Sequence, residues 1–244
     1  RMGLSTHEIA VFGANGYVVK REMFEHDAIE RITEEIDDLH DRMAESPTEG
    51  VGISWEEFGD VNMPKLIRQL MHSELVSRTL NKMLRSDTLL DIVEVLIGPN
   101  ISLYHSKLLM KAANDGSSIP WHQDYAYWEQ EGNEPLMLNC MVAIDRADLG
   151  NGCTQFVAGS HKWGLQEHER EKTSFGVFLP GYYQARDDAT PEVLEPGDAI
   201  FFSALIIHGS APNPSGRSRR INTFAFNVTG NGEGQCRELL RGTD

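Results

Sequence analysis

The sequence predicts a mainly β fold with flanking helices, in which a jelly-roll or cupin-type barrel lies behind a helical N-terminal layer. In the first third of the chain, apolar residues recur at spacings of three and four, which is the period of an amphipathic helix. After residue 100 the pattern changes to short β-favouring runs separated by turns rich in glycine, proline and asparagine. Several short strands behind a layer of helices are typical of such a barrel.

The helical layer is predicted from one apolar stripe and from its end signals. Asp27, with Glu30 three residues later, has the pattern of a capping box, and Ser46-Pro47 supplies a stop. A second helical stretch, over residues 80–97, ends at Gly98-Pro99. The stripe consists of Ile29, Ile32, Ile36, Leu39 and Met43.

The barrel is predicted from five β-favouring runs with turn sequences between them. We expect the acidic helices to cover one outer face of the barrel and the strands to form its mouth. At 244 residues the chain is long enough for one well-buried core. We therefore expect a single domain over residues 1–244, helical from about 20 to 98 and a barrel from about 100 to 230. The five runs are 101–112, 135–147, 154–158, 193–202 and 221–228.

The chain is acidic, and its composition is that of a globular protein. It has 22 Lys and Arg residues against 37 Asp and Glu residues, which gives a formal net charge of −15. Such a charge repels phosphate backbones and anionic membrane surfaces, so we expect neither nucleic acid nor a membrane as the main partner. We expect a small-molecule substrate, and a protein that is a monomer or a homodimer.

The sequence indicates a cytoplasmic location. The longest strongly apolar run, residues 199–207, is too short to span a bilayer, and the N-terminus lacks the apolar core of a signal peptide. Cys140, Cys153 and Cys236 are odd in number, far apart and without a C-x-x-C pair. This pattern argues against a disulfide framework or a thiolate zinc site, so we expect reduced thiols.

The segment Trp121-His122-Gln123-Asp124 and the distant His208 have the pattern of a metal site. A His-x-Asp pair with a second, distant histidine is the ligand set of a 2-His-1-carboxylate Fe(II) centre. Because strand side chains alternate, His122 and Asp124 can point to one side while Gln123 points away. If His208 reaches the same point on another strand, three positions on the iron stay open for a co-substrate and O2. The alternative is an ordinary hydrogen-bonded strand histidine at position 122.

Two adjacent arginines are candidates for binding a co-substrate. A 2-oxo acid that chelates iron needs a bidentate cation for its far carboxylate, and Arg219 or Arg220 can supply it. Arg219 shares a strand face with Ile221, whereas Arg220 shares one with Asn222. Alternation alone leaves open which face is the interior.

The aromatic residues just beyond the ligand pair have two interpretations. Tyr125, Tyr127 and Trp128 can form a wall of a substrate pocket or pack beneath the N-terminal helices. His105 alternates with Lys107 near the expected mouth of the barrel, where it could face the substrate.

Further motifs follow in a fixed order, and together with the ligand pattern they resemble a known family. They are Trp-His-Gln-Asp-Tyr-Ala-Tyr-Trp at 121–128, Ala-Ile-Asp at 143–145, Asn-Gly at 151–152, Gly-Ser-His-Lys at 159–162, Pro-Gly-Asp at 196–198 and His-Gly-Ser at 208–210. In this order they resemble the phytanoyl-CoA dioxygenase family of Fe(II)/2-oxoglutarate oxygenases. The resemblance extends from about residue 100 to 228 and, more loosely, to the Gly-Tyr-Val-Val segment at 16–19.

The resemblance implies a double-stranded β-helix barrel in which His122, Asp124 and His208 bind Fe(II), with 2-oxoglutarate and O2 as co-substrates. The family places its 2-oxoglutarate arginine eleven residues after the second histidine, which is Arg219 here. Ser210 matches a serine that supports the same carboxylate. Three further positions match residues that line the co-substrate pocket in relatives: Gln123, Asn139 and Lys107.

The activity implied is hydroxylation, or another oxidation, of a C–H bond in a small molecule, with release of succinate and CO2. Relatives that halogenate have Gly or Ala in place of the carboxylate ligand, so Asp124 favours hydroxylation. Two alternatives stay open. One is a catalytically silent barrel that binds a metal or ligand, and the other is an oxygenase that acts on protein side chains.

Overall fold

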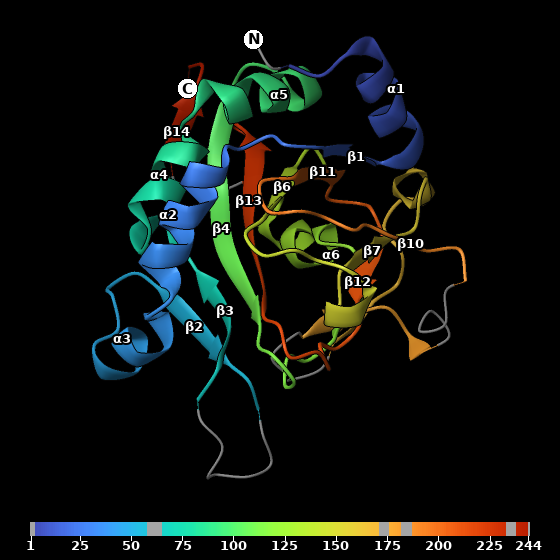
Figure 1. Ribbon diagram of the computed structural model, residues 1–244. Coiled ribbons are helices and arrows are strands. Elements are labelled where there is room, and N and C mark those ends of the chain that lie inside the picture. The colour runs from blue at the N-terminus through green and yellow to red at the C-terminus, as the bar shows by residue number, and fades with distance from the viewer. Residues whose placement is uncertain (1–2, 58–64, 171–175, 182–186, 233–237, 244) are drawn as a thin grey trace.

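The strands form two facing sheets (Figure 1). This is seen in a computed structural model, which describes residues 3–57, 65–170, 176–181, 187–232 and 238–243. The large sheet has the strand order β1-β11-β6-β13-β4-β3-β2, and its members are β1 (Tyr17–Lys20), β2 (Gly52–Trp55), β3 (Ile67–Met71), β4 (Ile101–Lys111), β6 (Leu138–Ala143), β11 (Ala199–Ser203), β13 (Arg219–Val228) and β14 (Glu238–Arg241), which pairs with β4. The small sheet has the order β10-β7-β12-β5, with β5 (Ile119–His122), β7 (Thr154–Phe156), β10 (Thr190–Pro191) and β12 (His208–Ser210). A separate pair joins β8 (Glu169–Arg170) to β9 (Val177–Phe178). The predicted jelly-roll barrel is confirmed.

The N-terminal helices cover the outer face of the large sheet. Figure 1 shows α2, α4 and α5 on one side of β4 and β13, and the small sheet on the other side. Ile32, Leu80 and Val93 on these helices form one buried cluster with Leu103 and Phe224 of the sheet. The α-helices are α1 (Thr6–Asn15), α2 (His26–Ile36), α3 (Leu39–Glu45), α4 (Arg78–Leu84), α5 (Asp87–Ile97) and α6 (Tyr125–Trp128), with short 3-10 turns η1 (Ser73–Leu75), η2 (Glu129–Glu131), η3 (Leu149–Asn151) and η4 (Ser160–Trp163).

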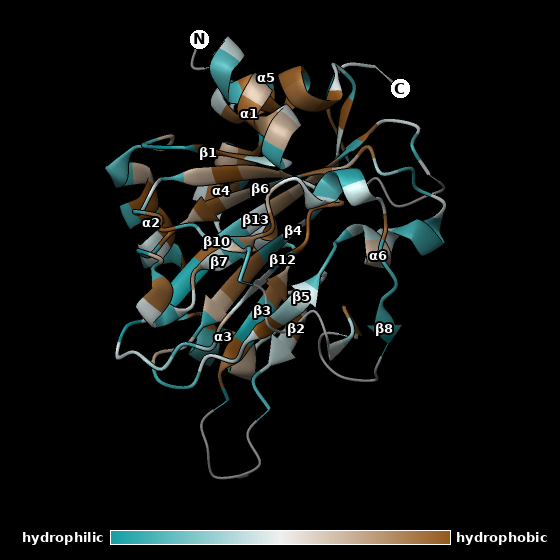
Figure 2. Cartoon of the chain, turned by 90° about the vertical axis from the view of Figure 1, so that its right-hand side faces the viewer, coloured by the Kyte–Doolittle hydropathy of each residue, from teal (hydrophilic) through white to brown (hydrophobic). Residues whose placement is uncertain are grey.

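Hydropathy explains this layering. Figure 2 shows α5 coloured largely as hydrophobic and β8 as hydrophilic. A second apolar cluster, which includes Phe156 of the small sheet and Ile200, Phe202 and Ile221 of the large one, fills part of the space between the sheets. Burial of apolar area of this kind is the main favourable term in folding. Within the described residues, no helix is long and apolar enough to cross a membrane.

The helical prediction is correct in its buried stripe and wrong in its boundaries. The stripe is divided between α2 and α3, and all five of its residues are buried. The capping box at Asp27 is wrong: α2 begins at His26, with Glu25 as its N-cap, so Asp27 lies inside the first turn, where its charge favours the helix dipole. The single helix over 80–97 is two helices, because the Ser86 hydroxyl accepts from Leu89 N–H and starts α5.

Periodicity did not predict three of the strands. Two of them, β2 and β3, lie where only helix was expected, and the third, β1, lies before that region. β2 and β3 form a hairpin, and β3 extends the large sheet beside β4. At the opposite edge, β1 pairs with β11, from Tyr17 opposite Phe202 to Lys20 opposite Ala199. Such short strands are stabilised by partners far away in the chain, which a local pattern does not reveal.

The cysteines that the structure describes are reduced, as expected. Cys140 and Cys153 are free and buried. Burial raises the pKa of the Cys140 thiol, which keeps it protonated and inert. Cys236 lies outside the described residues.

Candidate metal centre

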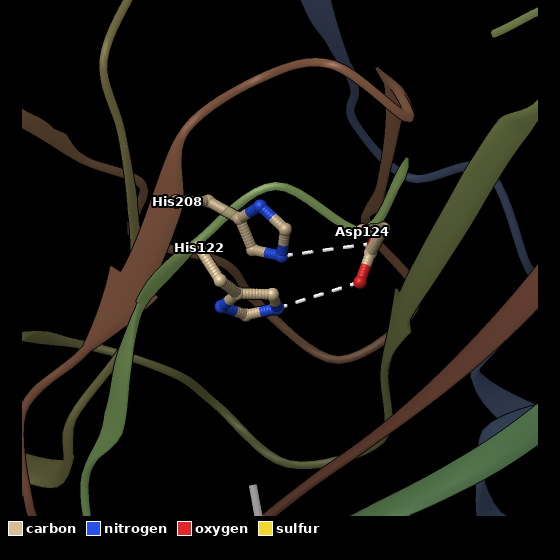
Figure 3. Close-up of side chains that lie close together, drawn as sticks. All are labelled: His122, Asp124 and His208. Carbon is tan, nitrogen blue, oxygen red and sulfur yellow. Dashed lines mark ion pairs between the residues drawn. The ribbon is translucent and has the colours of Figure 1, made fainter. Parts of the chain in front are cut away.

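His122 and His208 come together because their strands pair in the small sheet. His122 is the last residue of β5 and His208 the first of β12, and the two are direct antiparallel partners. Asp124 is not on a strand as predicted: β5 has ended, and Asp124 has αR backbone angles at the start of α6. The helical turn after the strand, not strand alternation, therefore brings the carboxylate to the two imidazoles (Figure 3).

The three side chains form a compact and buried cluster. His122 Nε2 lies 3.4 Å from Asp124 Oδ1, and His208 Nε2 lies 3.8 Å from Asp124 Oδ2. One donor atom from each of the three lies within 4.8 Å of the others, and the residues are only 8%, 4% and 6% exposed, in chain order. Adjacent ligands of an octahedral metal with bonds of about 2.1 Å lie roughly 3 Å apart, so small side-chain movements would close the site around an ion.

Hydrogen bonds fix both imidazoles with Nε2 turned toward the cluster. His122 Nδ1 is 2.8 Å from the Pro120 carbonyl, and His208 Nδ1 is 3.1 Å from the Ile206 carbonyl. Because a carbonyl can only accept, both Nδ1 atoms donate to it, which leaves both Nε2 atoms facing the cluster. This is the arrangement of metal-binding histidines.

Electrostatics keep the cluster in the protonation state that metals require. Burial, together with the nearby His122, lowers the pKa of His208 to about 4, so the ring is neutral at pH 7. Burial opposes ionisation of Asp124, but the nearby charge of Lys107 favours the carboxylate, and the pKa of Asp124 lies below its usual range. Asn139 Nδ2 also donates to Asp124 Oδ2 over 2.8 Å. His208 therefore offers a neutral nitrogen beside the carboxylate of Asp124, and His122 turns its Nε2 toward the same point.

A cavity of about 220 Å³ opens beside the cluster between the two sheets. Two of the predicted pocket residues, Lys107 and Ser210, line it, and so do Tyr127, Trp128 and His105. The pocket-wall interpretation of Tyr127 and Trp128 is therefore correct, although Trp128 also packs edge-on against His105. Burial lowers the pKa of His105 to about 3, so this ring is an uncharged part of the wall. Tyr125 donates instead to the Asn133 carbonyl.

The structure resolves which of the two arginines faces the interior. Arg219 is 0% exposed, and none of its three guanidinium nitrogens has a hydrogen-bond partner among the described residues. It lines a small pocket that shares Gln69, Leu109 and Ile119 with the large cavity. Arg220 points the other way, toward the helices, where its Nε and Nη2 atoms each donate to Asp145 over 2.9 Å.

Gln123, which matched a pocket position, does not line the cavity in the part of the chain that is described. Its Nε2 donates to the carbonyls of Gly164 and Leu205, and its Oε1 accepts from Gln166 N–H. Both polar atoms of the Gln123 amide therefore form hydrogen bonds within the protein. Asn139 acts on the site through Asp124, as described above.

Lys111 is a buried lysine beside Arg219 that the sequence reasoning missed. It is the direct cross-strand partner of Arg219, and its Nζ donates to the carbonyls of Ser117 and Ala211. Burial, reinforced by the charge of Arg219, lowers the pKa of Lys111 to about 6. The signal was present: Lys111 is four residues after Lys107 on one strand, so both side chains point to the same face.

The geometry describes a jelly-roll barrel with a 2-His-1-carboxylate cluster, and comparison with known proteins agrees with it. The chain matches the family described as Phytanoyl-CoA dioxygenase (PhyH) over residues 12–221. This match covers most of the chain, which belongs to that family.

Individual relatives are similar over part of their length. The chain is 32% identical to the peroxisomal phytanoyl-CoA dioxygenase of Bos taurus over 145 residues, which are 57% of this chain and 43% of that protein. It is 26% identical to the "Probable alpha-ketoglutarate-dependent hypophosphite dioxygenase" of Stutzerimonas stutzeri over 167 residues, 66% of this chain and 57% of that protein. The chain thus spans about half the length of these curated relatives.

A solved structure shares the fold. The crystal structure of EctD from S. alaskensis with 2-oxoglutarate and 5-hydroxyectoine has a TM-score of 0.76 against this chain at 19% identity. The likeness covers 93% of this chain and 77% of that one. It supports the double-stranded β-helix that the motifs implied.

Proposed function

We propose that the chain is a non-haem Fe(II)/2-oxoglutarate-dependent dioxygenase that oxidises a C–H bond of a small molecule and releases succinate and CO2. His122, Asp124 and His208 would hold the iron, and Arg219 would bind the far carboxylate of 2-oxoglutarate. One observation carries the proposal: the buried guanidinium of Arg219, which has no partner among the described residues, lines a small pocket that shares three residues with the cavity beside the His-Asp-His cluster. The names of the relatives support the same class of activity.

The donor chemistry fits the proposed cofactors. Two imidazole nitrogens and a carboxylate on one side of the metal suit Fe(II) and leave adjacent positions free. An unpaired buried cation is costly, and a bidentate carboxylate is the partner that its planar fork matches. Ser210 supports this assignment, because its buried hydroxyl lacks a partner among the described residues and lines the cavity.

When bound, Fe(II) would supply the activation of O2 that is coupled to oxidative decarboxylation of 2-oxoglutarate. The residues of the chain would bind and orient the co-substrate and shield the site from water. Lys107, whose Nζ lies 4.0 Å from Asp124 Oδ1, would contact the co-substrate beside the metal. Tyr127 and Trp128 exclude water from one side of the cavity. Asn139 holds the carboxylate ligand in place.

The substrate that we propose is a small metabolite. The cavity is small, and aromatic side chains form one of its walls. The relatives' names give a coenzyme A thioester and hypophosphite as substrates. We further propose a monomeric or homodimeric protein in the cytoplasm, which the free thiols of Cys140 and Cys153 support.

Succinate formation tests the proposed function directly. Protein loaded anaerobically with Fe(II) and 2-oxoglutarate is exposed to O2 with a panel of small metabolites, and succinate is measured. We expect iron-dependent succinate, increased by at least one metabolite. A silent metal-binding barrel would form none, and an oxygenase of protein side chains would respond to peptides and not to metabolites.

A further inference from the structure

Gln123 lies between two of the proposed iron ligands in the sequence, and a single chain segment bonds to both polar atoms of its side-chain amide. This segment, residues 164–170, bonds to the Gln123 amide through the Gly164 carbonyl over 2.9 Å and the Gln166 N–H over 2.8 Å. Farther along it, Arg170 Nη2 donates to the Ala126 carbonyl over 2.9 Å. The segment therefore follows the ligand loop from Gln123 to the first turn of α6.

His168 makes the one contact from this segment to the backbone of Gln123. Its Nδ1 lies 2.8 Å from the Gln166 carbonyl, which can only accept, so Nδ1 carries the proton. Its Nε2 is then a free acceptor, and Gln123 N–H donates to it over 3.0 Å. The imidazole thus connects the 164–170 segment to the peptide between His122 and Gln123.

This contact lies where the sheet stops holding the chain. Strand β5 ends at His122, and Asp124 has already entered the backbone angles of α6. Ladder hydrogen bonds therefore do not fix the peptide that sets the distance between the imidazole and the carboxylate. The Gln123 side chain also donates to the Leu205 carbonyl over 2.7 Å, three residues before His208. One anchored residue thus connects the approaches to all three ligands.

We infer that His168 is a positioning residue for the metal centre, which it serves by accepting the Gln123 N–H through Nε2. The inference rests on the proposed function, because it concerns the same three ligands. Partners outside the ligand shell that fix ligand orientation typically change metal affinity by about 10- to 100-fold. His168 differs from them because its hydrogen bond goes to a backbone peptide and not to a ligand side chain.

Three substitutions separate the two hydrogen bonds of His168. His168→Leu removes both of them. His168→Asn places an amide N–H near the position of Nδ1 and keeps the bond to Gln166, whereas His168→Gln places an amide oxygen near the position of Nε2 and keeps the bond to Gln123. We expect Mn(II), which prefers similar donors and is stable in air, to bind the Leu and Asn variants about tenfold or more weakly, and the Gln variant within about threefold of wild type.

The titration is followed by the electron paramagnetic resonance signal of free Mn(II), on protein shown to be folded by circular dichroism. Glu167→Leu is the matched control, because Glu167 is the exposed neighbour in the same segment, and it should bind Mn(II) as wild type does. The Asn variant keeps one bond, so it serves if the Leu variant does not fold. Equal affinity of the Asn and Gln variants would overturn the positioning role. Wild-type protein that binds no more Mn(II) than His122→Ala would instead overturn the metal centre itself.

Discussion

The two faces of the large sheet differ in whether their arginine side chains are paired within the protein. On the face beneath the helices, Arg220 is held by Asp145 and by Asp37, so its guanidinium is paired within the protein. On the cavity face, the adjacent Arg219 is fully buried and has no partner among the described residues. Folding alone accounts for the first arrangement. The second is costly in the free protein, and the proposed carboxylate of 2-oxoglutarate would complete it.

The largest effect expected on the cavity side is loss of activity without loss of the fold. His122→Ala or Asp124→Ala should abolish 2-oxoglutarate turnover, because two of the proposed ligands do not hold Fe(II) as three do. Succinate release measures activity and circular dichroism measures folding. Wild-type turnover in either folded variant would remove the residue from the ligand set.

A smaller effect should separate the two arginines in co-substrate binding. Arg219→Ala should raise the Michaelis constant for 2-oxoglutarate by roughly 100-fold, because a desolvated, charge-assisted pair is lost. Arg220→Ala should change it by less than about threefold. Steady-state kinetics with varied 2-oxoglutarate measure both values, and the opposite ranking would assign the co-substrate to Arg220.

The same two positions should show the reverse order in stability. In the ligand-free protein, Arg219→Met should raise the free energy of unfolding by about 1 kcal/mol, because it removes an unpaired buried charge. Arg220→Met should lower it by about 1–2 kcal/mol, because Asp145 loses its partner. Urea denaturation measures both changes. If Arg219→Met destabilises the ligand-free protein more than Arg220→Met does, the contrast between the two faces is wrong.

Lys111 should make the stability of the cavity side depend on pH above pH 6. Its pKa is about 6 in the folded protein against 10.5 as the ordinary value, so between these pH values the unfolded chain binds more protons than the folded one. The free energy of unfolding should therefore rise with pH in this window, by at most about 1.4 kcal/mol per pH unit. Lys111→Met should show a flatter rise between pH 7 and 9 in urea denaturation. Identical slopes would show that Lys111 is not perturbed.

The sequence predicted the His-Asp-His cluster better than the path of the chain through it. The pattern of His122, Asp124 and His208 identified residues that the structure brings together, and the five β-favouring runs each contain a strand. The reason offered for the His-x-Asp spacing was wrong, because Asp124 lies in a helical turn. Strand and turn can both bring two such side chains together, and periodicity over three residues does not distinguish them.

Other features depend on partners that no local pattern contains. Alternation divided β13 into two faces, but only the docking of the helices decides that Phe224 lies beneath them and that Ile221 faces the other sheet. Gln123 was expected in the pocket, and its amide is used by carbonyls and an N–H from segments far along the chain. Ser86 could have been recognised as a helix start from its residue type alone.

The pairing of β5 with β12 also constrains when the centre can form during synthesis. His122 leaves the ribosome well before His208, and Arg219 follows later still. A nascent chain that ends short of β12 has a histidine and an aspartate but lacks the second imidazole, so it cannot hold iron with all three donors. Iron held by all three proposed ligands can therefore be loaded only after β12 has been translated.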